Sequence, residues 1–181
     1  LLKSNLNAKI EGREKSPFSI WRKIQSKRIS LEQLTDIITL DCTLCAVQTL
    51  SKKRVLELIC EQATKVIDQF TTYSLLDSLL IREKMGSTGI GNGIAIPHGR
   101  LAGSNQVVAV IATCSKPIDF DAIDNRPVDI FVALFVPEEN CQAHLKTLQS
   151  IAELFSKKNF CRQVRKCQTS HELYQLIKQS N

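Results

Sequence analysis

The chain has 181 residues, of which 43% are hydrophobic and 23% charged, and its formal net charge is +6 at pH 7. This composition is typical of a globular protein. No apolar run approaches the ~20 residues that a membrane span needs, and no apolar stretch follows the basic N-terminus, so we expect neither a membrane span nor a secretory signal. We therefore expect a cytoplasmic protein without a membrane-inserted segment.

The net charge is concentrated at the N-terminus. Residues 1–30 contain eight lysines and arginines against two glutamates, and the rest of the chain has equal numbers of each sign. Such a basic segment either binds nucleic acid or an anionic surface, or is a solvated arm without a partner. We predict a basic arm or linker over residues 1–29 and one folded domain over residues 30–181, and we expect no nucleic acid as the main partner.

The first part of that domain is expected to be mostly helical. Ser30 and Gln33 resemble a capping box that opens a short helix, followed by brief β-prone residues 37–41. Ser51 is expected to cap a helix with an apolar face between Val55 and Ile67, which leaves Lys52 on the solvent side.

A second helix is predicted over residues 72–84, where Gly86 ends it in the usual manner of a glycine after a helix. Its expected inward positions are Tyr73, Leu76, Leu79 and Leu80. The helical spacing of these apolar residues is the basis for that assignment.

The second half of the chain predicts a sheet and further helices. The apolar runs 107–114 and 128–136 have the length of buried strands, and residues 116–121 read as a turn-rich connection. A helix over residues 140–156 should bury Leu145, Leu148, Ile151, Ala152 and Phe155. Shorter helices are expected near 158–166 and 170–179, the last capped by Ser170. This order of elements predicts an α/β or α+β sandwich.

The seven cysteines include a C-x-x-C pair, Cys42 and Cys45. Such a pair is compatible with redox chemistry or with half of a zinc site, but a zinc site needs a second pair at suitable spacing. Because the chain offers no such pair, we predict no metal site and interpret most cysteines as small buried apolar residues.

Residues 86–100, GSTGIGNGIAIPHGR, concentrate glycines and hydroxyls ahead of a Pro-His-Gly turn. Hydroxyls and unobstructed amides bind phosphate oxygens, and the candidates here are Ser87, Thr88, Gly89 and Gly91. Arg82 can add a planar donor, and the neutral imidazole of His98 is a competent nucleophile. The pattern suggests phosphoryl transfer to and from His98. The alternative is a structural glycine turn beside a passive histidine.

The same segment matches neither of the common nucleotide-binding loops. No Gly-Lys-Ser/Thr follows the glycines, and the predicted helix precedes the loop instead of following it, unlike a dinucleotide fingerprint. We expect no nucleotide cofactor.

Residues 83–99 resemble the phosphorylation-site signature of enzyme IIA proteins of the bacterial phosphotransferase system, fructose/mannitol class. The matching positions are Glu83, the pair Ile90-Gly91, and Ile94 through Gly99. Residues 51–59 and 118–129 look most like the nitrogen-regulatory branch. The likeness covers about residues 30–180 and implies a mixed β-sheet of about five strands with helices on both sides.

The resemblance also implies roles for individual residues. His98 would accept the phosphoryl group from an HPr/NPr-like phosphohistidine carrier protein. His144 would be the second active-site histidine, whereas its sequence context alone indicates a surface residue at a helix N-terminus. Arg82 would be the active-site arginine, and Ser87 and Thr88 weaker local donors. His171 has no match and is expected on the surface. No metal or cofactor is implied.

The function that this resemblance implies is regulation. The phosphorylated and unphosphorylated forms would bind different target proteins, such as transporters or sensor kinases in nitrogen or potassium control. The alternative is a sugar-specific IIA component that passes the phosphoryl group to an enzyme IIB. A third alternative is a protein that binds nucleic acid or a membrane surface through its basic arm. In either of the first two cases the resemblance implies a phosphohistidine relay protein of the phosphotransferase system.

Overall fold

Residues 33–180 are described by a computed structural model, apart from the side chains of residues 140–143. The predicted arm over residues 1–29 and the predicted cap at Ser30 lie outside this range. The helices are α2 (Leu34–Ile37), α3 (Lys52–Ala63), α4 (Thr72–Glu83), α5 (Cys141–Ser156), α6 (Lys158–Lys166) and α7 (Ser170–Lys178), with a short 3₁₀ turn η1 (Glu138–Asn140). The strands are β1 (Ile38–Val47), β2 (Gly89–Gly91), β3 (Ile94–Ala95), β4 (His98–Leu101), β5 (Val108–Ile118) and β6 (Val128–Pro137).

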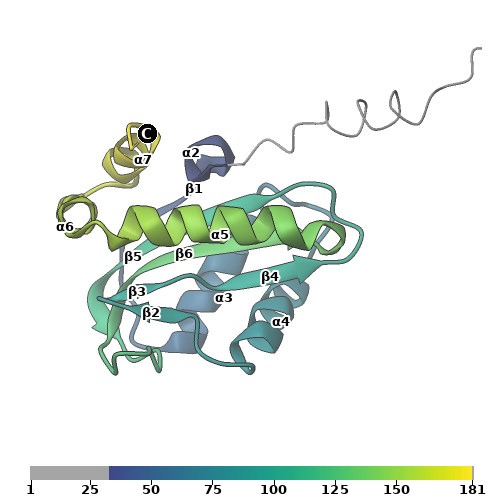
Figure 1. The fold of residues 1–181 in the computed structure, drawn as a ribbon, viewed down its shortest axis with the longest axis horizontal. Helices are drawn as coiled ribbons and strands as arrows, with labels where there is room; N and C mark the ends of the chain where they lie inside the picture. The colour runs from purple at the N-terminus through teal and green to yellow at the C-terminus, as the bar shows by residue number, and fades with distance from the viewer. Residues whose placement is uncertain (1–32, 181) are drawn as a thin grey trace, which may run out of the picture. The chain divides into compact units, whose positions relative to one another are not determined.

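The described strands form one mixed sheet of six strands, in the order β1-β5-β6-β3-β2, with β4 also paired to β6. β5 and β6 are antiparallel, whereas β1 runs parallel to β5 and β3 and β4 run parallel to β6. Helices α3 and α4 lie behind the sheet and α5 lies in front of it (Figure 1). The predicted α/β architecture is therefore confirmed, with one strand more than expected.

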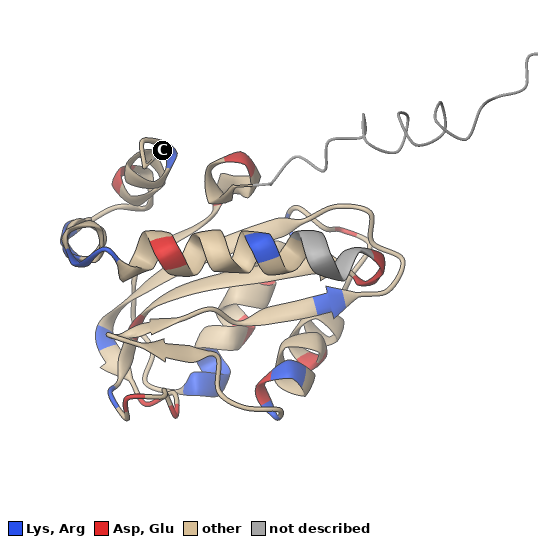
Figure 2. Cartoon of the chain, in the orientation of Figure 1, with Lys and Arg blue, Asp and Glu red and all other residues tan. Residues whose placement is uncertain are grey.

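The two apolar runs form the centre of the molecule. Most residues of β5 and nearly all residues of β6 are buried, as expected for strands that are covered on both faces. Figure 2 shows that the charged residues of both signs lie mainly on helices and loops, with few on the central strands. None of the helices within residues 33–180 is long and apolar enough to span a bilayer.

Strands β3 and β4 occupy the same edge of β6 in a single register. Ile94 pairs with Ile130 and His98 with Leu134, so the partners are 36 residues apart in both ladders. The interruption falls at Pro97, which has no N–H to donate to a ladder. Its carbonyl still accepts a bond of 2.9 Å from the Leu134 N–H. His98 is therefore the first residue of a strand, and the expected Pro-His-Gly turn is wrong.

Several expected boundaries and faces differ from the structure. β1 is ten residues long, where only residues 37–41 were expected, and β5 continues through Ile118 into the predicted connection. Ser51 caps α3 as predicted, by accepting a bond from the Arg54 N–H, but α7 is capped by Thr169 and not by Ser170.

Two residues expected in the core are on the surface. Tyr73 is 79% exposed and Leu145 is 64% exposed, whereas Leu75, absent from the predicted face, is fully buried. In both helices, the buried face is rotated slightly about the helix axis from the predicted face. The period of a pattern fixes which residues share a face, but the tertiary contacts decide which face turns inward.

Helix α4 packs tightly against β4. A Cβ atom placed on Gly99 would collide with the Ser78 side chain, and it would also lie only 3.3 Å from the Ser78 carbonyl carbon. Glycine at this position thus allows the helix to approach the strand that carries His98.

We expect Gly99→Ala to lower the free energy of unfolding by about 1–3 kcal/mol, the usual cost of overpacking a close contact. Urea denaturation measures this loss. In a Ser78→Gly background the same substitution should cost less, because the colliding side chain is gone. An equal cost in both backgrounds would contradict this explanation.

Candidate functional site

The end of α4 brings Arg82 against His98. The Arg82 Nε donates to the His98 Nε2 over 3.1 Å, and the Arg82 Nη1 donates to the Gly86 carbonyl over 2.9 Å. Arg82 lies in the last turn of the helix, and His98 begins β4. The guanidinium is therefore held at two points beside the ring, a pairing that the sequence did not predict.

The ring of His98 is held in one tautomer. Its Nδ1 lies 3.0 Å from the Ile96 carbonyl oxygen, which can only accept a hydrogen bond. Its Nε2 faces the Arg82 Nε, which can only donate. Both contacts require a proton on Nδ1 and a lone pair on Nε2, so Nε2 is the nucleophilic atom of the ring.

The surroundings also keep this ring neutral. Burial lowers the pKa of His98 below its ordinary value of 6.5, and the positive charges of Arg82 and Arg100 lower it further. The hydrogen bond to the Ile96 carbonyl opposes these effects without reversing them. At neutral pH the imidazole is thus uncharged and its Nε2 lone pair is present.

The side-chain hydroxyls of the glycine-rich segment donate hydrogen bonds to other groups of the protein. Ser87 Oγ donates to the Phe120 carbonyl over 2.7 Å, and Thr88 Oγ1 donates to a Glu83 carboxylate oxygen over 2.6 Å. The Thr88 N–H also points at that carboxylate, at 3.1 and 3.2 Å from its two oxygens. These contacts fasten the loop to the end of α4, and a phosphoryl-binding role for Ser87 and Thr88 stays a prediction.

The glycines of this segment shape a tight hairpin between β2 and β3. Asn92 and Gly93 at its tip both have positive φ, 56° and 81°, as two-residue hairpin loops of the Asn-Gly type require. A Cβ on Gly89 would lie 2.8 Å from the Ala122 Cα, so only glycine fits there. Sequence analysis missed this hairpin, although the Asn-Gly pair between apolar residues is a strong signal for it.

His144 lies in the first turns of α5 and is only 8% exposed. Its expected alternative, a surface residue, is thereby corrected, because α5 packs this side of the helix inward. Its role as the second active-site histidine stays a prediction. His171 is exposed on α7, as expected.

A groove of about 550 Å³ opens beside His98. Arg82, Arg100 and Glu138 contribute charged groups to it, Ile81 comes from α4, and Met85 comes from the turn after that helix. These two apolar side chains are 56% and 81% exposed. The groove leaves room for an approaching group at the ring and presents apolar surface around it.

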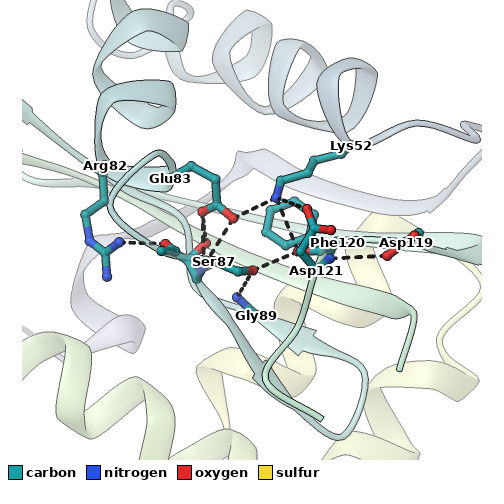
Figure 3. Close-up of polar contacts among 10 residues, drawn as sticks. Lys52, Arg82, Glu83, Ser87, Gly89, Asp119, Phe120 and Asp121 are labelled. Atoms are coloured by element: carbon teal, nitrogen blue, oxygen red, sulfur yellow. Dashed lines mark hydrogen bonds and ion pairs between the residues drawn. The ribbon is translucent and has the colours of Figure 1, made fainter. Parts of the chain in front are cut away.

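Lys52 is partly buried beside Glu83, although its sequence context predicted a position on the solvent side. Its Nζ lies 3.0 Å from a Glu83 oxygen and 3.0 Å from an Asp121 oxygen, and 4.4 Å from the centre of the Phe120 ring (Figure 3). Partial burial acts to lower the pKa of Lys52, but hydrogen bonds to Glu83 and Asp121 outweigh it, and the pKa is raised. The helical pattern gave no signal for this partnership, because Glu83 belongs to another helix.

The C-x-x-C pair consists of one fully buried and one partly buried cysteine. Cys42 is fully buried, and burial raises the pKa of its thiol. The Cys45 thiol donates to the Cys167 carbonyl. Among the described residues no group of three or more His, Cys, Asp or Glu side chains is placed to hold a metal ion.

Comparison with known proteins assigns the family. Residues 36–180 match the family described as phosphoenolpyruvate-dependent sugar phosphotransferase system, EIIA 2. The chain belongs to this EIIA 2 family. A nitrogen regulatory protein from Escherichia coli (strain K12) is 46% identical over 146 residues, which cover 80% of this chain and 89% of the relative. The resemblance to the nitrogen-regulatory branch is thus confirmed.

Solved structures agree with the EIIA 2 fold. The nitrogen regulatory protein IIA-Ntr from Neisseria meningitidis superimposes with a TM-score of 0.74 at 31% identity, over 79% of this chain and 97% of that one. IIA mannitol from Escherichia coli gives a TM-score of 0.64 at 14% identity, over 77% of this chain and 98% of that one, which shows a shared fold.

The lowered pKa of His98 predicts a pH-dependent stability. The unfolded chain binds a proton at the ordinary pKa, so the stabilisation from neutral His98 is complete above pH 6.5 and is lost as the pH falls through the lowered value. We expect NMR titration to give a pKa below 6.5, and Arg82→Gln to raise it by removing a cation 3.1 Å from the ring.

Arg162→Gln is the matched control, because Arg162 is an exposed arginine of α6 and its loss changes the net charge equally. It should leave the His98 pKa in place. A His98 pKa that Arg82→Gln does not move would contradict the electrostatic account.

Proposed function

We propose that this EIIA 2 protein accepts a phosphoryl group on the Nε2 atom of His98 from an HPr/NPr-like phosphohistidine carrier in the cytoplasm. The observation that carries the proposal is the pair of ring contacts, which leaves a neutral imidazole with its lone pair on Nε2. The groove beside His98 gives a carrier access to this atom.

The chemistry is a direct exchange between two imidazoles. The Nε2 lone pair of His98 attacks phosphorus, the bond from phosphorus to the carrier's histidine breaks, and its electron pair returns to the carrier's ring nitrogen. In the structure, Arg82 donates a hydrogen bond to the same Nε2 lone pair that would attack phosphorus. During transfer its guanidinium must therefore turn from Nε2 to the phosphoryl oxygens. Planar guanidinium donors suit phosphoryl oxygens, and they stabilise the charge of the transition state. His144 is proposed to steady the transferred group.

Phosphorylation would then act as a switch on partner binding. A phosphoryl group adds about −1.5 to −2 charges at pH 7, beside the exposed apolar residues Ile81 and Met85. A partner that packs on this apolar surface would tolerate one state and not the other. Because the relatives at 45–46% identity are named nitrogen regulatory proteins, we propose targets in nitrogen-related or potassium-related control, such as transporters or sensor kinases.

We expect intact-mass measurement to show one added phosphate after incubation with phosphoenolpyruvate, the upstream phosphotransferase and its carrier, at mildly alkaline pH. His98→Gln should show none, because it lacks the accepting nitrogen. The chain has three histidines, so His171→Gln is a matched control and should keep the phosphate. A phosphate retained in folded His98→Gln, or none in the wild type, would refute the proposal.

A sugar-transport role is the second candidate, because the family description names a sugar phosphotransferase system. The phosphorylated protein, mixed with a IIB protein of the fructose or mannitol type, decides between the two. A regulatory role predicts that the phosphate stays on His98. Rapid loss of phosphate to the IIB cysteine, followed by mass, would favour transport.

A further inference from the structure

A series of hydrogen bonds runs through the site from Arg82 to Glu83, the last two residues of α4. Arg82 donates to His98, whose Nδ1 donates to the Ile96 carbonyl over 3.0 Å. The Ile96 N–H in turn donates to the Thr88 carbonyl over 3.0 Å. Thr88 donates from its N–H and its hydroxyl to Glu83, which directly follows Arg82. The position of the imidazole thus depends on Glu83 as well as on Arg82.

Lys52 holds the Glu83 end of this series of hydrogen bonds. The Glu83 side chain is only 7% exposed, and the Lys52 ammonium is its cationic partner in Figure 3. Lys52 also donates to the Phe120 carbonyl over 3.3 Å, so it ties the carboxylate to the segment that follows β5. A carboxylate this deeply buried is costly without a charged partner, and removing Lys52 would let Glu83 turn away from Thr88.

We propose that Lys52 and Glu83 are positioning residues for phosphoryl transfer, which fix the Ile96 carbonyl and through it the tautomer and direction of the His98 ring. This inference rests on the proposed phosphorylation of His98. When the Thr88–Ile96 contact shifts, Nδ1 loses its acceptor and the proton is free to occupy Nε2. That tautomer has no lone pair at the attacking atom, so a fraction of the protein becomes unable to react.

A purely structural role makes different predictions. The ion pair also joins α3 to α4, and a structural role would lower stability while the remaining folded protein reacts normally. A positioning role lowers kcat with the KM for the carrier unchanged, since neither residue lines the groove at His98. It also changes the ring ¹⁵N signals of His98, which report the tautomer directly.

The test compares Glu83→Gln and Lys52→Gln with Arg54→Gln. Arg54 lies on the same helix as Lys52 and pairs with Glu57 and Glu61 on the exposed side, so its loss removes the same charge away from the site. We expect the first two variants to lower kcat for phosphorylation by about 10- to 100-fold, the usual effect of small misplacements of reacting groups, and to populate the Nε2–H tautomer. Arg54→Gln should match the wild type.

Thr88→Val keeps the test decisive if the charge variants unfold, because valine preserves the shape and removes only the hydroxyl that donates to Glu83. It should lower kcat to a smaller degree. Wild-type kcat and an unchanged tautomer in a folded Glu83→Gln or Thr88→Val variant would overturn the positioning role. A wild type that takes no phosphate would instead refute the proposed function, so the two failures are distinguishable.

Discussion

The pairing of residues 94–101 with β6 is the constraint on which the site depends. The register passes unchanged across Pro97, because the two residues on either side of the break keep the same offset from their partners. The gap in the ladder is local. The Ile96 N–H donates to the Thr88 carbonyl, and the Ile96 carbonyl accepts from the His98 ring. The residue before Pro97 thus holds the imidazole ring beside the paired segment.

Two consecutive residues at the end of α4, Arg82 and Glu83, carry opposite charges and make different contacts. Arg82 faces the ring and, after burial, helps to lower the pKa of His98, which favours the neutral nucleophile. Glu83 points the other way, into a buried contact with Lys52. The two charges would interfere if both pointed to one place. They are consecutive residues of α4 whose side chains leave the helix about 100° apart, so Arg82 contacts the His98 ring while Glu83 contacts Thr88 and Lys52.

The groove and the buried network suit a protein whose partners are other proteins. Exposed Ile81 and Met85 lie beside a polar reacting group, and this combination supports transient docking with a charge-dependent outcome. The close packing of α4 against Gly99 keeps Arg82 at a fixed distance from His98. The neutral imidazole is therefore held in one defined orientation by the protein's own contacts.

The sequence by itself determined the central strands and the existence of most helices, because these depend on local periodicity and on residue types close along the chain. It also singled out Arg82 and His98 as candidates, from their residue types and from the resemblance of the segment around them, and their roles in phosphoryl transfer stay predictions. Only the tertiary structure decided that Tyr73 faces solvent, that Lys52 is the partner of Glu83 and that the His98 proton sits on Nδ1. Each of these depends on groups from different elements meeting in space, where burial and hydrogen-bond geometry outweigh local preference.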